Sequence, residues 1–325
     1  MGISNSGGIG WVMTDKKLVY VTAMTAGEYY RKLSEKIEAR DDLVYSMLPL
    51  KYQAGEWEVM RIVSKKIGPV DKLMVIRGTI HGDEIAGALT ILNYFDELVN
   101  YAHGKGIKLI IYPLANPSGF EKGRRYNVDN DKGQGNNDFI RYRLTDGSIG
   151  EVDLGPEDAF SEWLFSDDPS LAIHLPEETR LFQKVIRQDP LDQVVAAIDL
   201  HQDFITPELP PYAYHYAYGD LSVLRPIARR VAEVVPVLAH FDMNAGFGEQ
   251  IDENGKVVPR TGGSGFLSDE DGFIVRHDAT FSDFFYRRGA KYSVTTETSG
   301  ATPMEKACEV NWIWIEGLID LAAKS

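Results

Sequence analysis

Three apolar segments of the sequence each end in side chains that can bind a metal ion or move a proton. The first ends in His81-Gly82-Asp83-Glu84, the second in His201-Gln202-Asp203, and the third in Glu297. His81 lies at a predicted strand-to-helix corner and Glu84 follows three residues later, so both can face one point. Two imidazoles and one carboxylate, with one coordination position left for water, suit zinc. These segments are therefore candidates for a catalytic zinc site.

The elements that must position these side chains alternate between buried strands and amphipathic helices. Near-continuous apolar runs predict strands at 72–80, 108–115, 194–200 and 292–296. Such strands alternating with helices indicate an α/β fold with a mostly parallel, mixed sheet that helices cover on both faces. In these sheets, ligands bind beyond the carboxyl ends of the strands, where the candidate residues lie. Helices are predicted at 83 to about 102 and near 25–40, 176–188, 221–235, 279–289 and 304–323.

Composition and charge argue against several classes of protein. A chain of 325 residues, 44% hydrophobic and 25% charged, is typical of a globular protein, and its net charge of −14 disfavours binding to nucleic acid or anionic membranes. Cys308 is the single cysteine, so an intramolecular disulfide is excluded. Without a signal-peptide pattern or a membrane-length apolar run, we expect a cytoplasmic protein. We predict one domain over 1–325, with 1–70 beginning the sheet.

The order of the motifs resembles that of the zinc carboxypeptidases, the carboxypeptidase A-like superfamily, and of their relatives, the aspartoacylases and succinylglutamate desuccinylases. In that superfamily one strand ends in His-x-x-Glu, a later strand ends in Asp-Leu-His, and a final strand carries the catalytic Glu. The resemblance extends from about residue 70 to the end. Its motifs here are Gly78-Thr79-Ile80-His81-Gly82-Asp83-Glu84, Asn116-Pro117-Ser118-Gly119-Phe120, Ile198-Asp199-Leu200-His201 and Tyr292-Ser293-Val294-Thr295-Thr296-Glu297.

The resemblance implies a zinc-dependent hydrolase in which one zinc ion is held by His81, Glu84 and His201. Glu297 is then the general base, which takes a proton from the attacking water and delivers it to the leaving nitrogen. A positive group must also stabilise the oxyanion of the tetrahedral intermediate. Arg125 is the residue that we expect in this role, and its neighbour Arg124 is a candidate for binding substrate.

One motif departs from the carboxypeptidase pattern. In carboxypeptidases, the segment after the Asn-Pro-x-Gly-Phe turn usually contains Asp-x-Asn-Arg, whose Asn and Arg bind the free carboxylate of the substrate. Here Asn130 is the candidate for that substrate-binding Asn, but Asp131 stands where the Arg is expected, and a carboxylate facing a carboxylate is repulsive. Asp131 could bind an amine of the substrate instead. The free carboxylate of the substrate would then be bound by another basic residue, for which the candidates are Arg141, Arg143 and Arg276.

We therefore expect a zinc metallocarboxypeptidase that cleaves an amide bond in a peptide or N-acyl amino acid. Asp283, in a segment that resembles the lining of the family's specificity pocket, would favour a polar or basic side chain. One helix follows Glu297, whereas desuccinylase-type relatives usually add a β-rich domain there, which favours the peptidase reading. The alternatives are an N-acyl amino acid deacylase with the same metal and base, and a catalytically inactive zinc-containing binding protein.

Overall fold

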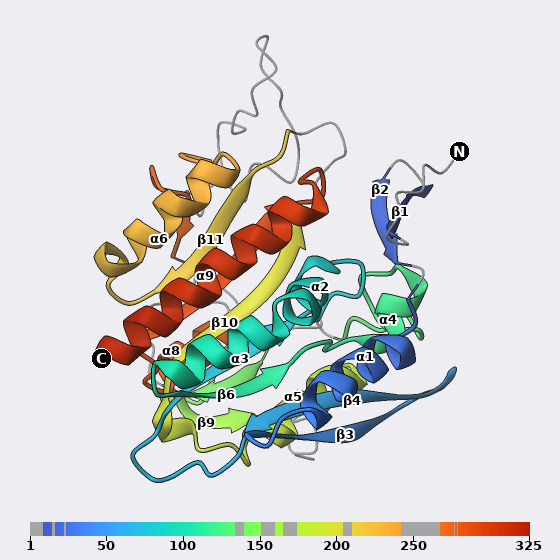
Figure 1. Ribbon diagram of the computed structural model, residues 1–325, viewed down its shortest axis with the longest axis horizontal. Coiled ribbons are helices and arrows are strands. Elements are labelled where there is room, and N and C mark those ends of the chain that lie inside the picture. The colour runs from blue at the N-terminus through green and yellow to red at the C-terminus, as the bar shows by residue number, and fades with distance from the viewer. Residues whose placement is uncertain are drawn as a thin grey trace.

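The centre of the protein is an eight-stranded mixed sheet in the order β12-β11-β13-β10-β5-β6-β4-β3 (Figure 1). The computed structural model describes residues 9–14, 17–22, 24–133, 140–150, 160–164, 174–203, 210–241, 267–275, 277 and 279–325. The strands of the sheet are β3 (Leu43–Tyr52), β4 (Gly55–Ser64), β5 (Lys72–Gly78), β6 (Ile107–Tyr112), β10 (Val194–Asp203), β11 (Ala213–Tyr218), β12 (Phe273–Ile274) and β13 (Tyr292–Ser299).

The four middle strands, β6, β5, β10 and β13, are parallel to one another. On one side of them β11 pairs antiparallel with β13, and on the other β4 pairs antiparallel with β6 and β3. Register aligns the ends of the central strands, since Gly78 pairs with Leu200 and His201 pairs with Glu297. The predicted α/β class with a mixed sheet is confirmed. The assignment of one domain to 1–325 stays a prediction.

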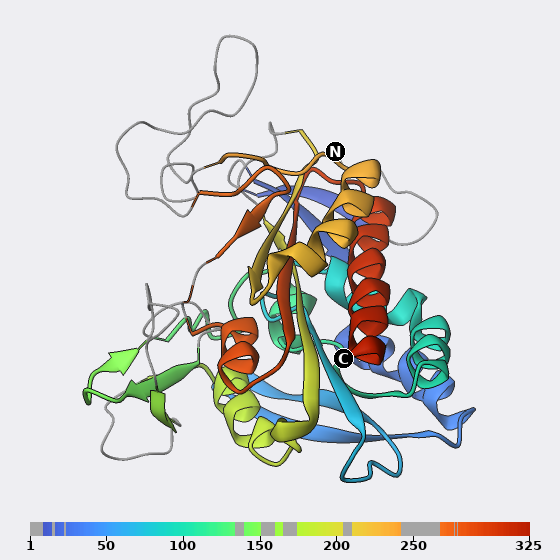
Figure 2. The same cartoon turned by 90° about the vertical axis from the view of Figure 1, so that its left-hand side faces the viewer.

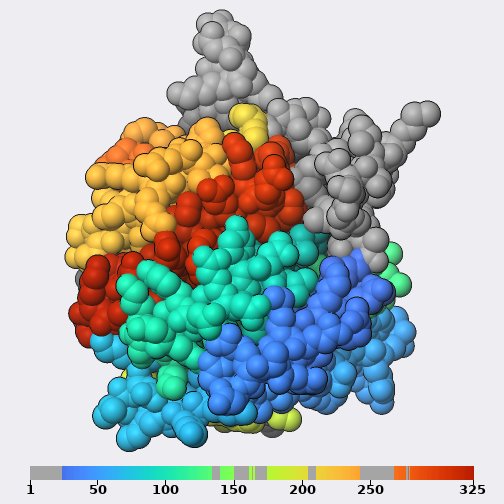
Figure 3. All heavy atoms as spheres, viewed as in Figure 1, coloured from blue at the N-terminus to red at the C-terminus, as the bar shows by residue number. Residues whose placement is uncertain are grey.

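Helices cover both faces of the sheet, as the edge-on view of Figure 2 shows. One face carries α1 (Ala26–Glu38), α2 (Ala86–Asn93), α3 (Phe95–Gly104), α6 (Leu221–Val234) and α9 (Met304–Lys324). Figure 3 shows these helices side by side across that face. The opposite face carries α5 (Glu177–Ile186) and α8 (Phe281–Arg287). Each face has its own apolar core, and the middle strands contribute alternate residues to the two cores.

Smaller elements lie at the margins of this framework. A hairpin of β1 (Ile9–Thr14) and β2 (Lys17–Thr22) precedes α1, and β7 (Arg141–Leu144), β8 (Ile149–Gly150) and β9 (Phe160–Leu164) form a three-stranded sheet. The short helix α4 (Pro117–Lys122) follows β6, and a 3-10 turn (Leu191–Gln193) precedes β10. Among the described residues no helix combines the length and apolar character needed to cross a bilayer.

The prediction of one helix from 83 to about 102 was wrong, because this segment forms two helices. Tyr94 separates α2 from α3 with a non-helical backbone, and its ring stacks on Trp312 of α9 at 5.2 Å. The segment also begins later than predicted. Thr79, at a positive φ of 57°, donates its hydroxyl to the Glu84 carbonyl and accepts from Ala88 N, which closes a turn before α2. Glu84 therefore lies in that turn rather than in the helix.

Candidate metal centre

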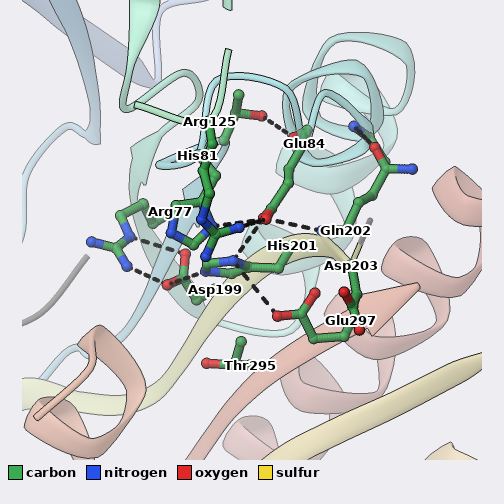
Figure 4. A network of polar contacts seen from close by, with 12 residues as sticks. Arg77, His81, Glu84, Arg125, Asp199, His201, Gln202, Asp203, Thr295 and Glu297 are labelled. Carbon is green, nitrogen blue, oxygen red and sulfur yellow. Dashed lines mark hydrogen bonds and ion pairs between the residues drawn. The ribbon is translucent and has the colours of Figure 1, made fainter. Parts of the chain in front are cut away.

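The candidate ligands and the candidate base meet at the carboxyl edge of three adjacent parallel strands. His81 follows β5, His201 lies near the end of β10, and Glu297 lies at the paired position of β13. Glu84 reaches the same place from the turn that precedes α2. Figure 4 shows the four side chains converging from these elements. Sheet register thus brings together groups that lie far apart in the chain.

Glu84 contacts both histidines of the cluster. Its Oε1 lies 2.8 Å from His81 Nδ1, and its Oε2 lies 2.8 Å from His201 Nδ1. The two imidazole rings meet edge to face, with centroids 4.9 Å apart. One ligand atom from each of the three residues lies within 4.8 Å of the others. All three side chains are 2% exposed, so this set of donors is withdrawn from bulk water.

This donor set fits a metal ion. A buried carboxylate between two imidazoles is an arrangement of hard and borderline ligands that suits a divalent cation such as zinc. Burial raises the pKa of the Glu84 carboxyl, but the neighbouring His81 and His201 outweigh burial and hold that pKa well below its usual range. Glu84 is therefore poised as an anion, which is the form that binds a metal.

Glu297 lies beside this donor set rather than within it. Its Oε1 is 3.7 Å from His201 Nδ1, and among the described residues its Oε2 is buried without a hydrogen-bond partner. Burial raises the pKa of the Glu297 carboxyl well above its usual range, and the nearby Glu84 and Asp203 carboxylates add to that rise. A buried carboxyl with a raised pKa next to a metal site is suited to taking and returning a proton.

Arg125 also belongs to the cluster, because its guanidinium donates to Glu84 Oε1 at 2.8 Å. The Asn-Pro motif holds it there. The Asn116 side chain caps α4 by accepting from Gly119 N, and it donates to the Arg125 carbonyl. Gly82 N donates to the same carbonyl at 3.0 Å. The motif therefore anchors the backbone of Arg125 against the corner that carries His81.

Two polar residues directly after His201 complete the surroundings. Asp203 accepts from Tyr214 at 3.0 Å and from Tyr212 at 3.5 Å, and burial raises the pKa of Asp203 to about 7. The Gln202 side chain accepts from Ala86 N and so connects β10 to the start of α2. Tyrosines recur at every second position from Tyr212 to Tyr218, which indicates a strand but not its neighbours. The antiparallel pairing of β11 with β13 is what brings Tyr212 and Tyr214 to this edge.

Three other predicted site residues, Arg124, Asn130 and Asp131, have different surroundings. Arg124 is exposed beside Arg125, and Asn130 is exposed in a turn at a positive φ of 58°. Asp131 contacts His174 Nε2 at 2.8 Å, so the geometry gives its predicted contact with substrate no support.

Asp283 is fully buried, and its partners explain why it is not open to a substrate. It accepts from His277, Tyr142, Arg287 and the backbone N–H of Ala279. These bonds tie α8 to β7 and to the segment before α8, which is a structural role. Arg276, the other predicted contact, lies outside the described residues.

Comparisons with known proteins agree with this geometry. Residues 71–141 match the family "Succinylglutamate desuccinylase/Aspartoacylase catalytic domain". A candidate metallopeptidase from Shewanella denitrificans OS217 is 17% identical, with a TM-score of 0.63 over 96% of this chain and 100% of the other. A candidate metallopeptidase from Shewanella baltica OS155 is 18% identical, with a TM-score of 0.61 over 91% and 92%.

A more distant structural match is thrombin activatable fibrinolysis inhibitor, at 14% identity and a TM-score of 0.55 over 93% of this chain and 74% of the other. No curated protein sequence matches the chain. At these identities the structural likeness concerns the fold. Together with the family match, it confirms the resemblance to the zinc carboxypeptidase superfamily and its aspartoacylase relatives.

Proposed function

We propose that this chain, which has the fold of the zinc carboxypeptidase superfamily, is a zinc-dependent hydrolase that cleaves an amide bond by metallocarboxypeptidase chemistry. One observation carries the proposal: three buried donors within 4.8 Å of one another, His81, Glu84 and His201, with the Glu297 carboxyl beside them. A structural zinc usually has four protein ligands. A set of three with an adjacent carboxyl favours catalysis.

Each residue of the cluster has its own role in the proposed hydrolysis. His81, Glu84 and His201 would hold the ion, which when bound supplies a Lewis acid for the carbonyl and lowers the pKa of water. Glu297 accepts the proton of the attacking water on its carboxylate and returns it to the leaving nitrogen. Arg125, at the rim of the same cluster, stabilises negative charge as it develops on the carbonyl oxygen.

The nature of the substrate separates two versions of the proposal. A carboxypeptidase releases a C-terminal residue from a peptide, and the whole-chain likeness to metallopeptidase structures supports it. An N-acyl amino acid deacylase releases an acyl group from the same kind of amide, and the family match over 71–141 supports that second candidate. The same metal ligands and base would serve either reaction.

The test is to replace Glu297 by Gln and assay a panel of peptides and N-acyl amino acids. The substitution keeps the size of the side chain but removes the proton acceptor, so we expect bound zinc to persist while kcat falls by about 10²- to 10⁴-fold. Glu121→Gln is the matched control. Glu121 accepts from Ala26 N and Trp57 Nε1 outside the cluster, so turnover should persist in that variant.

The products decide between the versions of the proposal. Release of C-terminal residues by the wild type supports the carboxypeptidase, and release of acyl groups alone supports the deacylase. Zinc bound without turnover of any substrate in the panel would favour the inactive binding protein. Equal turnover by wild type and Glu297→Gln would remove Glu297 from the role of general base.

A further inference from the structure

Arg77 places a buried positive charge one residue away from the candidate metal centre, because it pairs with Asp199, which contacts His201. The residue lies on β5, and its side chain is 2% exposed. Its guanidinium lies over the Phe281 ring, 4.4 Å from the centroid, and 5.7 Å from the Phe182 centroid. Arginine is rarely buried without a paired anion, and here that anion is Asp199.

Two hydrogen bonds join Arg77 to Asp199 in a bidentate pair. Arg77 Nε donates to Asp199 Oδ1 at 2.9 Å, and a terminal nitrogen donates to Oδ2. The pair follows from the sheet, because Arg77 and Asp199 are register partners on the parallel strands β5 and β10. A guanidinium fork that matches a carboxylate in this way fixes its orientation as well as its position.

The same carboxylate holds a predicted metal ligand. Asp199 Oδ2 lies 3.0 Å from His201 Nε2, on the side of the ring away from Glu84 (Figure 4). To bind a metal, Nδ1, which faces Glu84, must offer its lone pair, and the Asp199 carboxylate is then the acceptor for the hydrogen on Nε2. Contacts of this kind set the tautomer and the ring orientation of metal-binding histidines.

We infer that Arg77 is a positioning residue, which holds the Asp199 carboxylate against His201 Nε2 and thereby raises the affinity of the centre for its metal. The inference rests on the proposed metal centre and deepens it. Arg77 acts only through Asp199 and touches neither substrate nor metal. Arg77 affects the affinity for a metal ion in two opposite ways, and a measurement of zinc affinity shows which effect is larger.

The charge of Arg77 by itself opposes a bound cation, whereas its bidentate bond to Asp199 favours one. Without Arg77, a fully buried carboxylate loses its cation and the fork that orients it, and breaking such a pair is costly. We expect this loss to outweigh the relief of repulsion, since removal of an outer partner typically weakens metal binding by about 10- to 100-fold.

The experiment measures zinc affinity of the metal-free full chain by competition with a chromophoric chelator. Arg77→Met should bind zinc about 10- to 100-fold more weakly than wild type. Arg77→Lys keeps the charge without the fork and should lose less. Arg61→Met is the matched control. Arg61 also pairs with a buried aspartate, Asp189, but that pair does not touch the centre. The zinc affinity of Arg61→Met should equal that of wild type.

A double variant tests whether Arg77 acts through Asp199. If it does, Arg77→Met combined with Asp199→Asn binds zinc no more weakly than Asp199→Asn alone. Additive losses would overturn the proposed route. Unchanged or tighter binding by folded Arg77→Met would overturn the positioning role, as would an equal loss in Arg61→Met. If Arg77→Met fails to fold by circular dichroism, Arg77→Lys decides: an affinity equal to wild type contradicts the inference.

These outcomes are distinguishable from failure of the proposed function, because affinity is measured without turnover. A wild type that binds zinc and hydrolyses nothing would remove the hydrolase and leave the role of Arg77 intact. An active wild type with unchanged affinity in Arg77→Met would do the reverse. A wild type that binds no zinc would remove the metal centre and this inference with it.

Discussion

Adjacent arginines at positions 124 and 125 have different surroundings. Arg125 donates to Glu84 and keeps 39% of its side chain exposed, so it is fixed at the cluster but open to a ligand. Arg124 is exposed, and its N–H donates to the carbonyl of Gly119. A partly exposed guanidinium that lies beside the candidate metal donors can stabilise an oxyanion there, whereas one that lies away from those donors cannot.

The pair of arginines yields a prediction at the scale of single residues. Arg125→Met should lower kcat/KM by about 10²- to 10³-fold, as loss of one oxyanion donor typically does. Arg124→Met, a neighbour of the same chemistry, should retain the turnover of wild type. Steady-state kinetics on the best substrate of the panel provide the measurement. Equal losses in the two variants would contradict the assignment of Arg125.

At the scale of elements, the corner after β5 depends on close contact with α4. A Cβ added at Gly82 would lie 2.2 Å from the carbonyl carbon of Gly119, which is backbone and cannot rotate away. Gly82 N also donates to the Arg125 carbonyl. A glycine at position 82 lets the corner that carries His81 and Glu84 pack directly on α4.

Gly82→Ala should therefore separate β5 from α4. We expect the free energy of unfolding to fall by about 1–3 kcal/mol or more, as overpacking usually costs, with weaker zinc binding as well. Gly104→Ala is the control, because a Cβ added at Gly104 meets no atom within 4 Å. Urea denaturation of both variants measures the difference. Loss of stability in Gly104→Ala alone, or in neither variant, would refute the close-packing argument.

At the scale of the whole molecule, a metal would connect parts of the chain that are remote in sequence. The candidate ligands come from the end of β5, the turn before α2 and the end of β10, with both apolar cores below them. These donors are assembled only in the folded state, because register brings the strands together. A ligand that binds the folded state alone stabilises it by mass action.

Metal removal should consequently lower thermal stability. At free zinc 1,000 times its Kd, the stabilisation is about 4 kcal/mol, so Tm should drop when a chelator removes the metal. His201→Ala, which lacks one proposed ligand, should show little difference between zinc and chelator. Calorimetry in both conditions makes the comparison. The same Tm for wild type with zinc and with chelator would argue against a metal centre at these residues.

The sequence by itself determined the fold class and the residues that meet at the sheet edge. Apolar strands alternating with helices demand a covered sheet, and parallel strands expose their carboxyl ends together, so His81, His201 and Glu297 could be grouped before any contact was known. Arg125 was likewise predicted from its place after the Asn-Pro motif. These conclusions depend on local pattern and chain order, which a sequence carries directly.

Only the tertiary structure decided which charged groups pair with one another. Arg77 and Asp199 are linked by strand register, and Asp203 meets Tyr214 of β11 because that strand runs antiparallel to β13. Asp131 and Asp283, predicted as substrate contacts, have partners elsewhere. Pairing of this kind depends on which strands become neighbours and on burial, and neither is encoded in the spacing of residues along one segment.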